Sequence, residues 1–414
     1  MNDPRRPPGS GTGRDAKAGA GRRHAPPGGQ PHEHATARFQ EGGALLQGGR
    51  AGEAAEVLEE AADLFAGLPH QQARARNLLG AALRMDGRLD GAAAAFEAAL
   101  AGFEAEGQAL EAAASAYNLG LVQAQTGDHG AARDSFEAAR ERFNGMGATV
   151  QAAAAGRELG AALLAIGEPE RAVEVMRSAV DASAGAGDRV GQAAGANTLG
   201  LALLAGGRTA EAIEALRSAT GAHPRGVRPG GYAMAKANLA LAYEAHGDHP
   251  RARLAAAQAA GTPGADAPVR AQAEAVLDRL GRNEGDLAAV LDDEPPERWL
   301  AVTGEELARL VDADDGERRR SAAGWIQGQL DRPGQGPERA ESWLGALLEL
   351  PPPAMEQLIR TTLEALAARE EDDRQSFRSQ TSQAMGRFNV PQWMRLQSFF
   401  SRAAEDLGLG GRWG

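Results

Sequence analysis

A Leu-Gly pair recurs at intervals of 40 residues along this chain of 414 residues. The first pair is Leu79-Gly80, and the register continues through Leu119-Gly120, Leu159-Gly160, Leu199-Gly200 and finally Leu239-Ala240. Glycine inside a helix costs about 1 kcal/mol relative to alanine. A glycine that returns at a fixed place in Leu-rich runs therefore needs a packing reason, and its constant period indicates stacked structural units.

Other positions keep the same register. The same residue type recurs 40, 80, 120 and 160 residues after three further positions, which are Gly87, Ala92 and Ala99. The position of Phe96 is more variable, because its counterparts are Phe136, Met176, Leu216 and Ala256. A shorter copy lies upstream at an offset of 38, with Gly42, Gly49, Ala54, Leu58 and Ala61. The chain thus holds six copies of one unit.

Each copy is expected to form two antiparallel helices, A and B. Gly87 supplies the turn after helix A, and the following residues "RLDGAAAAFEAAL" begin helix B. Gly80 and Ala92 are expected to be small because the two helices touch there, with Leu79 and Phe96 beside the contact. A larger side chain would overpack the contact at a cost of about 1–3 kcal/mol.

This register resembles the tetratricopeptide repeat, whose units place Leu-Gly on helix A and Ala, Phe and Ala on helix B. The resemblance covers residues 35 to about 262, with repeats about 6 residues longer than the usual form and no proline closing helix B. It is similar to the long-repeat subclass found in cell-polarity scaffolds, kinesin light chains and bacterial regulators. The resemblance implies an all-α solenoid, a right-handed superhelix of about six helix pairs whose concave wall is made of A helices.

Three regions are expected. Residues 1–34 are a flexible Pro-, Gly- and Arg-rich tail, residues 35–282 the solenoid, and residues 283–414 a separate α-helical module. Within the solenoid, Pro and Gly at 220–232 predict a hinge or bulged loop, and 267–281 reads as a capping helix. The module contains all five tryptophans and four helical runs, at 303–313, 321–330, 338–350 and 351–369.

Near the C-terminus, an apolar stripe at helical spacing has two interpretations. It includes Trp393, Leu396, Phe399 and Phe400, and it either packs against Leu358, Leu363 and Leu366 or docks a partner or a second copy of the chain. The polar segment 369–389 before it is a mobile linker or a long exposed helix, and the basic cluster 316–320 reads as a solvated helix start.

Composition limits the function. The net charge of −12 argues against a nucleic-acid partner, and the absence of cysteine excludes disulfides and thiolate chemistry. The sequence has no run of 18 apolar residues, so no membrane span is expected. The N-terminus lacks the apolar segment of a secretion signal, and a cytoplasmic location is expected.

Catalytic motifs are not found. No phosphate loop, nucleophile elbow or dinucleotide fingerprint occurs, and no cofactor is expected. His32 with His34, and His246 with Asp248 and His249, are the local metal-like groups, but Asp248 is better placed to cap a helix. The acidic residues of 291–297 lack anything in the sequence to position them.

The family resemblance places ligand contacts on helix A, around the Leu-Gly pair. Carried over here, the positions are Arg74, Asn77, Arg84, Tyr117, Asn118, Asn197 and Asn238. An asparagine amide both donates to and accepts from a peptide backbone, although these residues also suit an ordinary wet surface. The A helices at 112–127 and 192–206 carry almost no charge, so the groove is expected to be nearly neutral apart from a basic corner at Arg74, Arg76, Arg84 and Arg88.

The sequence therefore predicts a non-enzymatic adaptor that binds a protein or peptide in the groove, with a possible homodimer through the C-terminal module. The alternative is a sensory regulator, in which the groove binds a signal peptide or small molecule and the module acts on a transcription or defence component. An enzyme with its active site wholly within 283–414 is the third interpretation.

Overall fold

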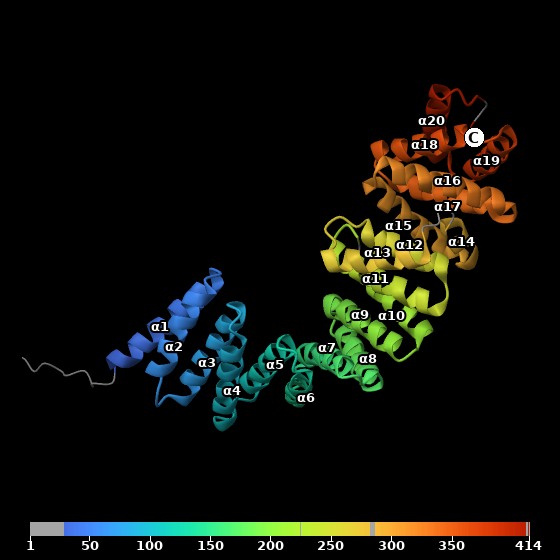
Figure 1. Ribbon diagram of the computed structural model, residues 1–414. Helices are drawn as coiled ribbons and strands as arrows, with labels where there is room; N and C mark the ends of the chain where they lie inside the picture. The colour runs from blue at the N-terminus through green and yellow to red at the C-terminus, as the bar shows by residue number, and fades with distance from the viewer. Residues whose placement is uncertain (1–28, 224, 282–285, 411–412, 414) are drawn as a thin grey trace, which may run out of the picture. The chain divides into compact units, whose positions relative to one another are not determined.

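The computed structural model describes residues 29–223, 225–281, 286–410 and 413, and in these residues the chain is helical without strands. The chain forms two compact units, 1–108 and 109–414 (Figure 1). None of the described helices is long and apolar enough to cross a membrane.

The first unit holds two helix pairs. They are α1 (Gly29–Gln47) with α2 (Ala51–Leu64), and α3 (Pro69–Met85) with α4 (Leu89–Ala105). Because α1 begins at Gly29, the predicted flexible tail is wrong for residues 29–34, which are helical; the rest of that tail lies outside the described residues.

The second unit begins with four more pairs of consecutive helices (Figure 1). Helices α5 (Ala109–Gln125) and α6 (His129–Gly145), α7 (Thr149–Ala165) and α8 (Pro169–Gly185), α9 (Arg189–Ala205) and α10 (Thr209–Ala222), and α11 (Pro229–His246) and α12 (His249–Ala260) form these pairs. The predicted capping helix forms as α13 (Ala267–Leu280), which packs on α11 and α12. The six predicted helix pairs are thus confirmed.

The turn glycines adopt the left-handed conformation that the sequence requires of them. Gly87 has φ of 79°, and its counterparts Gly127, Gly167, Gly207 and Gly247 have φ between 72° and 85°. The structure adds a second set halfway between them, because Gly107, Gly147 and Gly187 close helix B with φ of 67–71°. From Gly87 to Gly207 the turn glycines therefore recur every 20 residues, half of the 40-residue period of the Leu-Gly pairs.

The packing reason for the Leu-Gly glycine differs from the prediction. A Cβ built on Gly80 would lie 2.8 Å from the ring of Phe96, and one on Gly120 would lie 2.7 Å from the ring of Phe136. The same clash would involve Met176 at Gly160 and Leu216 at Gly200. The glycine on helix A therefore makes room for the large side chain of helix B, whereas the prediction assigned its small size to a contact with Ala92.

The predicted interruption at 220–232 is present. Helix α10 ends at Ala222, and α11 begins at Pro229. In the connection, Arg225 donates hydrogen bonds of 3.0 Å to the backbone oxygens of Ala308 and Gly261 and forms an ion pair with Asp312. These contacts fix the connection to the end of α12 and to a later helix.

Beyond α13 the consecutive pairing of helices ends. The remaining elements are α14 (Asp286–Asp293), η1 (Pro296–Arg298), α15 (Trp299–Asp312), α16 (Asp315–Asp331), η2 (Pro333–Gln335), α17 (Gly336–Glu349), α18 (Pro352–Ala367), α19 (Glu371–Met385) and α20 (Val390–Asp406). Here alternate helices pack together: α15 on α17, α16 on α18, α17 on α19 and α18 on α20. These helices belong to the same compact unit as repeats α5–α12, and α14 and α15 contact α12.

Tryptophans supply much of the core of the C-terminal helices. Trp299, Trp325, Trp343 and Trp413 are buried there, and Trp325 stacks on Trp343 with ring centroids 6.1 Å apart. The polar segment 369–389 contains a helix, α19, but one face of it is buried through Phe377, so neither predicted form describes it fully. The basic cluster begins α16 as predicted, although Arg318 is buried.

Candidate functional site

Three A helices of the second unit expose equivalent side chains. Leu110 and Tyr117 on α5, Val150 and Arg157 on α7, and Val190 and Asn197 on α9 stand seven residues apart and so share one face of each helix. Leu110, Val150 and Val190 are about half exposed, although they are apolar. Between them lie Ala114, Ala154 and Ala194, which are at least partly exposed and have small side chains. We call this surface the A face; it comprises Leu110, Ala114, Tyr117, Asn118, Val150, Ala154, Arg157, Glu158, Val190, Ala194, Asn197 and Thr198.

Amide side chains link successive A helices at one end of this surface. The Nδ2 of Asn238 on α11 donates to the Oδ1 of Asn197 on α9 over 3.0 Å, and the Nε2 of Gln272 on α13 donates to the Oδ1 of Asn238 over 2.9 Å. Asn238 is 6% exposed, so its amide is used within the chain. Asn197 is partly exposed, and of these three amide residues it is the one that belongs to the A face.

The A face carries one pair of opposite charges. Burial raises the pKa of Glu158 above the ordinary glutamate value, and the charge of neighbouring Arg157 lowers it in part. Arg157 lies across the next A helix, because a Cβ on Gly195 would come within 3.3 Å of its Cδ. The glycine on α9 thus provides the space in which the arginine lies.

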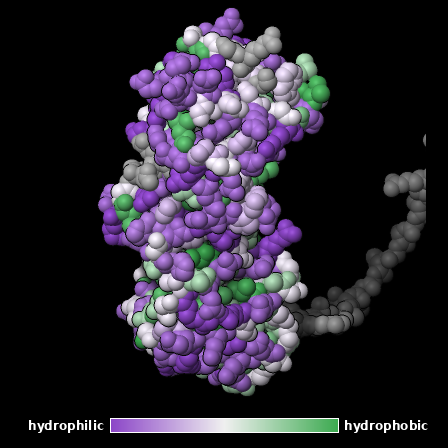
Figure 2. All heavy atoms as spheres, turned by 90° about the vertical axis from the view of Figure 1, so that its right-hand side faces the viewer, coloured by the Kyte–Doolittle hydropathy of each residue, from purple (hydrophilic) through white to green (hydrophobic). Residues whose placement is uncertain are grey.

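The B helices of the second unit carry more charged side chains than α5, α7 and α9. Ion pairs join consecutive repeats there: Arg171 with Glu137, and Arg177 with Glu211. On the face that Figure 2 shows, hydrophilic side chains predominate and hydrophobic ones form separate spots. The half-exposed leucine and valines at matching positions of the A face therefore contrast with the charged B helices.

The predicted residues of the first unit lie on a single helix, α3. Arg74 is exposed, with its guanidinium 5.4 Å from the ring centroid of Phe39 on α1. Asn77 and Arg84 are partly buried, and the Nε of Arg84 is a buried atom without a hydrogen-bond partner. The structure thus brings these three residues together on α3, whereas Tyr117, Asn118, Asn197 and Asn238 belong to the second unit.

The apolar stripe of α20 packs within its own chain. Leu396 and Phe400 are fully buried in a core that includes Leu358, Leu363 and Leu366, and Trp393 and Phe399 pack against that core while partly exposed. These contacts agree with the packing interpretation of the stripe. Docking of a partner or a second copy stays a prediction.

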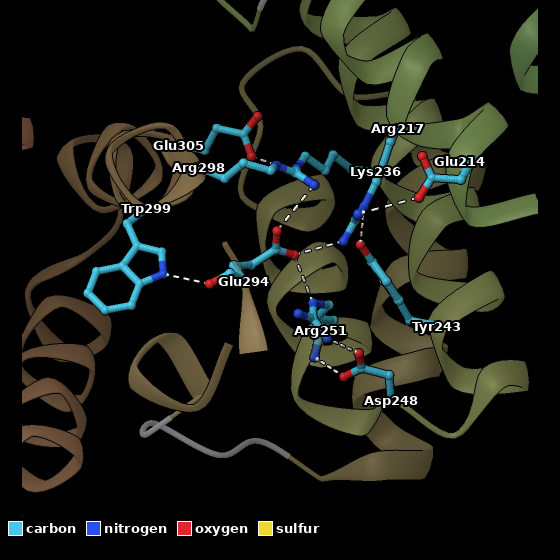
Figure 3. Close-up of polar contacts among 10 residues, drawn as sticks. All are labelled: Glu214, Arg217, Lys236, Tyr243, Asp248, Arg251, Glu294, Arg298, Trp299 and Glu305. Carbon is cyan, nitrogen blue, oxygen red and sulfur yellow. Dashed lines mark hydrogen bonds and ion pairs between the residues drawn. The ribbon is translucent and has the colours of Figure 1, made fainter. Parts of the chain in front are cut away.

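Glu294, one of the acidic residues of 291–297 for which the sequence offered no positioning partner, is held in place by arginines and connects the repeats to the C-terminal helices (Figure 3). The side chain of Glu294 is 3% exposed, and its Oε1 accepts from Arg217 on α10 over 2.7 Å and from Arg251 on α12 over 3.0 Å. Its Oε2 lies 3.2 Å from Arg298, and its backbone oxygen accepts from the indole of Trp299 over 2.8 Å. Three arginines from separate segments therefore meet at one carboxylate.

The arginines around Glu294 have further acidic or hydroxyl partners. Arg217 donates to the hydroxyl of Tyr243 over 2.8 Å, and Arg251 pairs with Asp248 (Figure 3). Burial lowers the pKa of Arg251, but its pairs with Asp248 and Glu294 outweigh that effect and hold it above the ordinary value. Because its charges are paired within the chain, this network suits a structural connection better than the binding of an external ion.

Two members of the second candidate metal group, Asp248 and His246, have structural contacts. Asp248 caps α12 by accepting from the backbone nitrogen of Arg251 over 3.1 Å, as predicted, and His246 lies 2.9 Å from the hydroxyl of Thr209. Among the described residues, no group of three histidine or acidic side chains is arranged to hold a metal ion.

Solved structures with similar repeats occur in several organisms. One is a set of nearly identical repeats from a putative kinesin light chain of Podosopora anserina, with 20% identity, a TM-score of 0.42, and coverage of 47% of this chain and 96% of that one. Another is pilF of Pseudomonas aeruginosa, with 16% identity, a TM-score of 0.44, and coverage of 59% and 99%. A Rap protein complexed with competence and sporulation factor shows 13% identity and a TM-score of 0.36 over 91% of this chain and 99% of that one.

Sequence profiles give the family. None of the curated proteins compared with the chain matches it. Two profiles described as tetratricopeptide repeat do match, one at residues 71–144 and the other at 22–69, 117–187 and 197–268. Together they span more than half of the sequence, in the same segments that form the helix pairs, and the chain therefore belongs to the tetratricopeptide repeat family.

Proposed function

We propose that the chain is a non-catalytic adaptor that binds a peptide segment of a protein partner on the A face of the second unit. The observation that carries this proposal is the repetition of half-exposed Leu110, Val150 and Val190 at matching positions of α5, α7 and α9. Apolar side chains at that exposure supply contact area to a ligand, and their regular spacing suits a segment that crosses successive helices.

Polar groups on the same surface support a peptide as the ligand. Tyr117, Asn118, Asn197 and Thr198 stand beside the apolar positions, and hydroxyl and amide groups can bond to a peptide backbone. The alanines between them allow the ligand to approach closely. With one pair of opposite charges, Arg157 and Glu158, the surface favours a ligand of low net charge.

The proposal is tested by selecting peptides from a displayed random library with the full-length chain as the target. The A-face variant carries Asn118→Ala, Val150→Ser and Val190→Ser, and the control carries Arg177→Ala and Glu211→Ala on the B helices. We expect a family of apolar, weakly charged peptides that the control variant retains and the A-face variant loses. Enrichment of no peptide family, or a family retained equally by both variants, would refute the proposal.

The role of a regulator is a second candidate, and the Glu294 network favours it. Because Glu294 joins α10 and α12 to the segment preceding α15, a change in repeat packing would reach the C-terminal helices through these contacts. All five tryptophans lie at 299–413. A selected peptide that changes their fluorescence would support regulation, and saturating binding without any change would leave the adaptor role alone.

A further inference from the structure

A cavity of about 100 Å³ lies in the second unit between the last repeat helices and the C-terminal helices. Its walls come from the seven helices α12 to α18, and apolar side chains such as Leu254, Leu277, Leu307 and Leu358 line much of it. Trp325 and Trp343 lie on one side, stacked at an interplanar angle of 22°. The cavity is distinct from the A face, and nothing in the proposed function uses it.

Most of the charged side chains that line this cavity are paired within the chain. Arg253 forms two hydrogen bonds with Asp286, of 2.7 and 2.8 Å, and Arg309 pairs with both Glu306 and Glu317. The hydroxyls of Thr361 and Thr362 donate to backbone oxygens within α18. A charged ligand would lose its hydration here without gaining a free counter-charge from these groups, so a neutral ligand is favoured.

One residue of the lining carries a donor that lacks an acceptor. The indole nitrogen of Trp325 is buried and has no hydrogen-bond partner, and the residue as a whole is 4% exposed. Among the buried unpartnered side-chain atoms of the described residues, it is the one that belongs to the cavity lining. A buried N–H without an acceptor is unfavourable. A water molecule needs two or more polar partners to be held, and the lining hydroxyls of Thr361 and Thr362 already donate within α18.

We propose that this cavity binds a small neutral apolar molecule the size of a single ring, whose carbonyl oxygen accepts a hydrogen bond from Trp325. The apolar walls would hold the hydrocarbon part, and the indole N–H would orient the oxygen. Because the cavity is built from both the last repeats and the C-terminal helices, a bound molecule would stabilise their packing.

The test uses two probes of nearly the same shape, cyclopentanone and methylenecyclopentane, which differ in their C=O and C=CH₂ groups. They are titrated into the full-length chain labelled with ¹⁵N while the five indole N–H resonances are followed. We expect saturable binding of both probes, with cyclopentanone about 2- to 10-fold tighter, which corresponds to one net hydrogen bond. The ketone is expected to move the Trp325 indole resonance downfield.

Variants assign the effect. Trp325→Phe keeps an aromatic ring but removes the N–H, and it is expected to bring the affinity ratio of the two probes close to one. Ala257→Leu narrows the cavity from α12 and is expected to weaken both probes. Trp393→Phe, outside the cavity lining, identifies its own resonance and is expected to leave binding unchanged.

Several results would overturn the inference. They are the absence of saturable binding to the wild-type chain, equal affinity for the two probes, or a ketone-induced shift at other indoles but not at Trp325. If both cavity variants fail to fold, the wild-type titration still decides, because the affinity ratio and the set of shifted resonances are measured without them. Failure here would leave the A-face proposal untouched, since the two sites share no residue.

Discussion

The ring of Phe96 fills the space that a side chain on Gly80 would occupy, with a separation of 2.8 Å between the ring and a Cβ built on that glycine. The same relationship joins Gly42 to Leu58, Gly120 to Phe136, Gly160 to Met176 and Gly200 to Leu216. In the last repeat, both residues are alanine, Ala240 and Ala256, and both are fully buried. A larger residue on helix A thus accompanies a smaller one on helix B.

This relationship predicts a compensating pair of substitutions. Gly80→Ala gains about 1 kcal/mol of helix propensity, but the clash with Phe96 costs about 1–3 kcal/mol, so we expect no gain or a net loss of stability. Phe96→Ala alone is expected to cost about 3–5 kcal/mol. The double variant reproduces the pair at 240 and 256 and should cost less than the sum of the single changes. Urea unfolding followed by circular dichroism measures all three; strict additivity would contradict the account.

Removing the charge of Glu294 is expected to destabilise the connection between the repeats and the C-terminal helices. Glu294→Gln removes the buried carboxylate that Arg217 and Arg251 share, and loss of one partner of a buried ion pair typically costs about 3–5 kcal/mol. The matched control is Glu214→Gln, because Glu214 also pairs with Arg217 but is 75% exposed, and its removal should cost less than about 1 kcal/mol.

Tryptophan fluorescence during urea unfolding measures this difference, since every tryptophan lies beyond residue 298. Glu294→Gln should shift the fluorescence transition to lower urea, with a smaller shift for Glu214→Gln. Equal shifts for the two variants would show that the buried carboxylate has no special role.

The pH dependence of stability tests the environment of Glu158. Burial raises the pKa of this carboxyl in the folded chain, so between the unfolded value of about 4.3 and the raised folded value the folded state binds more protons than the unfolded state. Ionisation of Glu158 therefore lowers the free energy of unfolding as pH rises from the unfolded pKa to the folded pKa. Above the folded pKa the full destabilisation is present. Glu158→Gln should be more stable than the wild type at neutral pH, and the difference should shrink as pH falls towards 4.3. A difference that grows on acidification would contradict the assignment.

The basic residues of α3 yield a separate prediction for the first unit. If Arg74 and Arg84 attract acidic residues of a partner, Arg74→Glu with Arg84→Glu should weaken binding of acidic peptides several-fold at low salt, and added salt should reduce the difference. The control is Arg171→Glu, which changes an exposed charge on a B helix of the second unit. Unchanged binding by the α3 variant would remove this basic corner from the account.

Much of the fold was predictable because it is local and repeated. The turn glycines, the helix pairs and the prolines at the start of α18 follow from residue types at fixed spacing. The predicted partner of Gly80 was wrong because spacing alone does not say whether Ala92 or Phe96 lies opposite the glycine. The three-dimensional structure shows that the partner is Phe96.

The sites were less predictable, for two different reasons. Leu110, Val150 and Val190 keep the 40-residue register, so an apolar residue near the start of each of these A helices is a signal that the sequence contains. Glu294 meets Arg217 and Arg251 across 77 and 43 residues, outside any repeat, and no sequence pattern marks such a contact. The buried N–H of Trp325, which has no hydrogen-bond partner, likewise depends on how the seven helices that line the cavity pack together.

The central claim is that the A face binds peptide, and calorimetric titration of one library-selected peptide tests it most directly. The peptide should bind the full-length wild-type chain and the control variant, Arg177→Ala with Glu211→Ala, with the same Kd. It should bind the A-face variant, which carries Asn118→Ala, Val150→Ser and Val190→Ser, at least about tenfold more weakly. That difference corresponds to a loss of about 1.4 kcal/mol across three truncated contacts. An unchanged Kd in the A-face variant, with its helical content intact, would contradict the account.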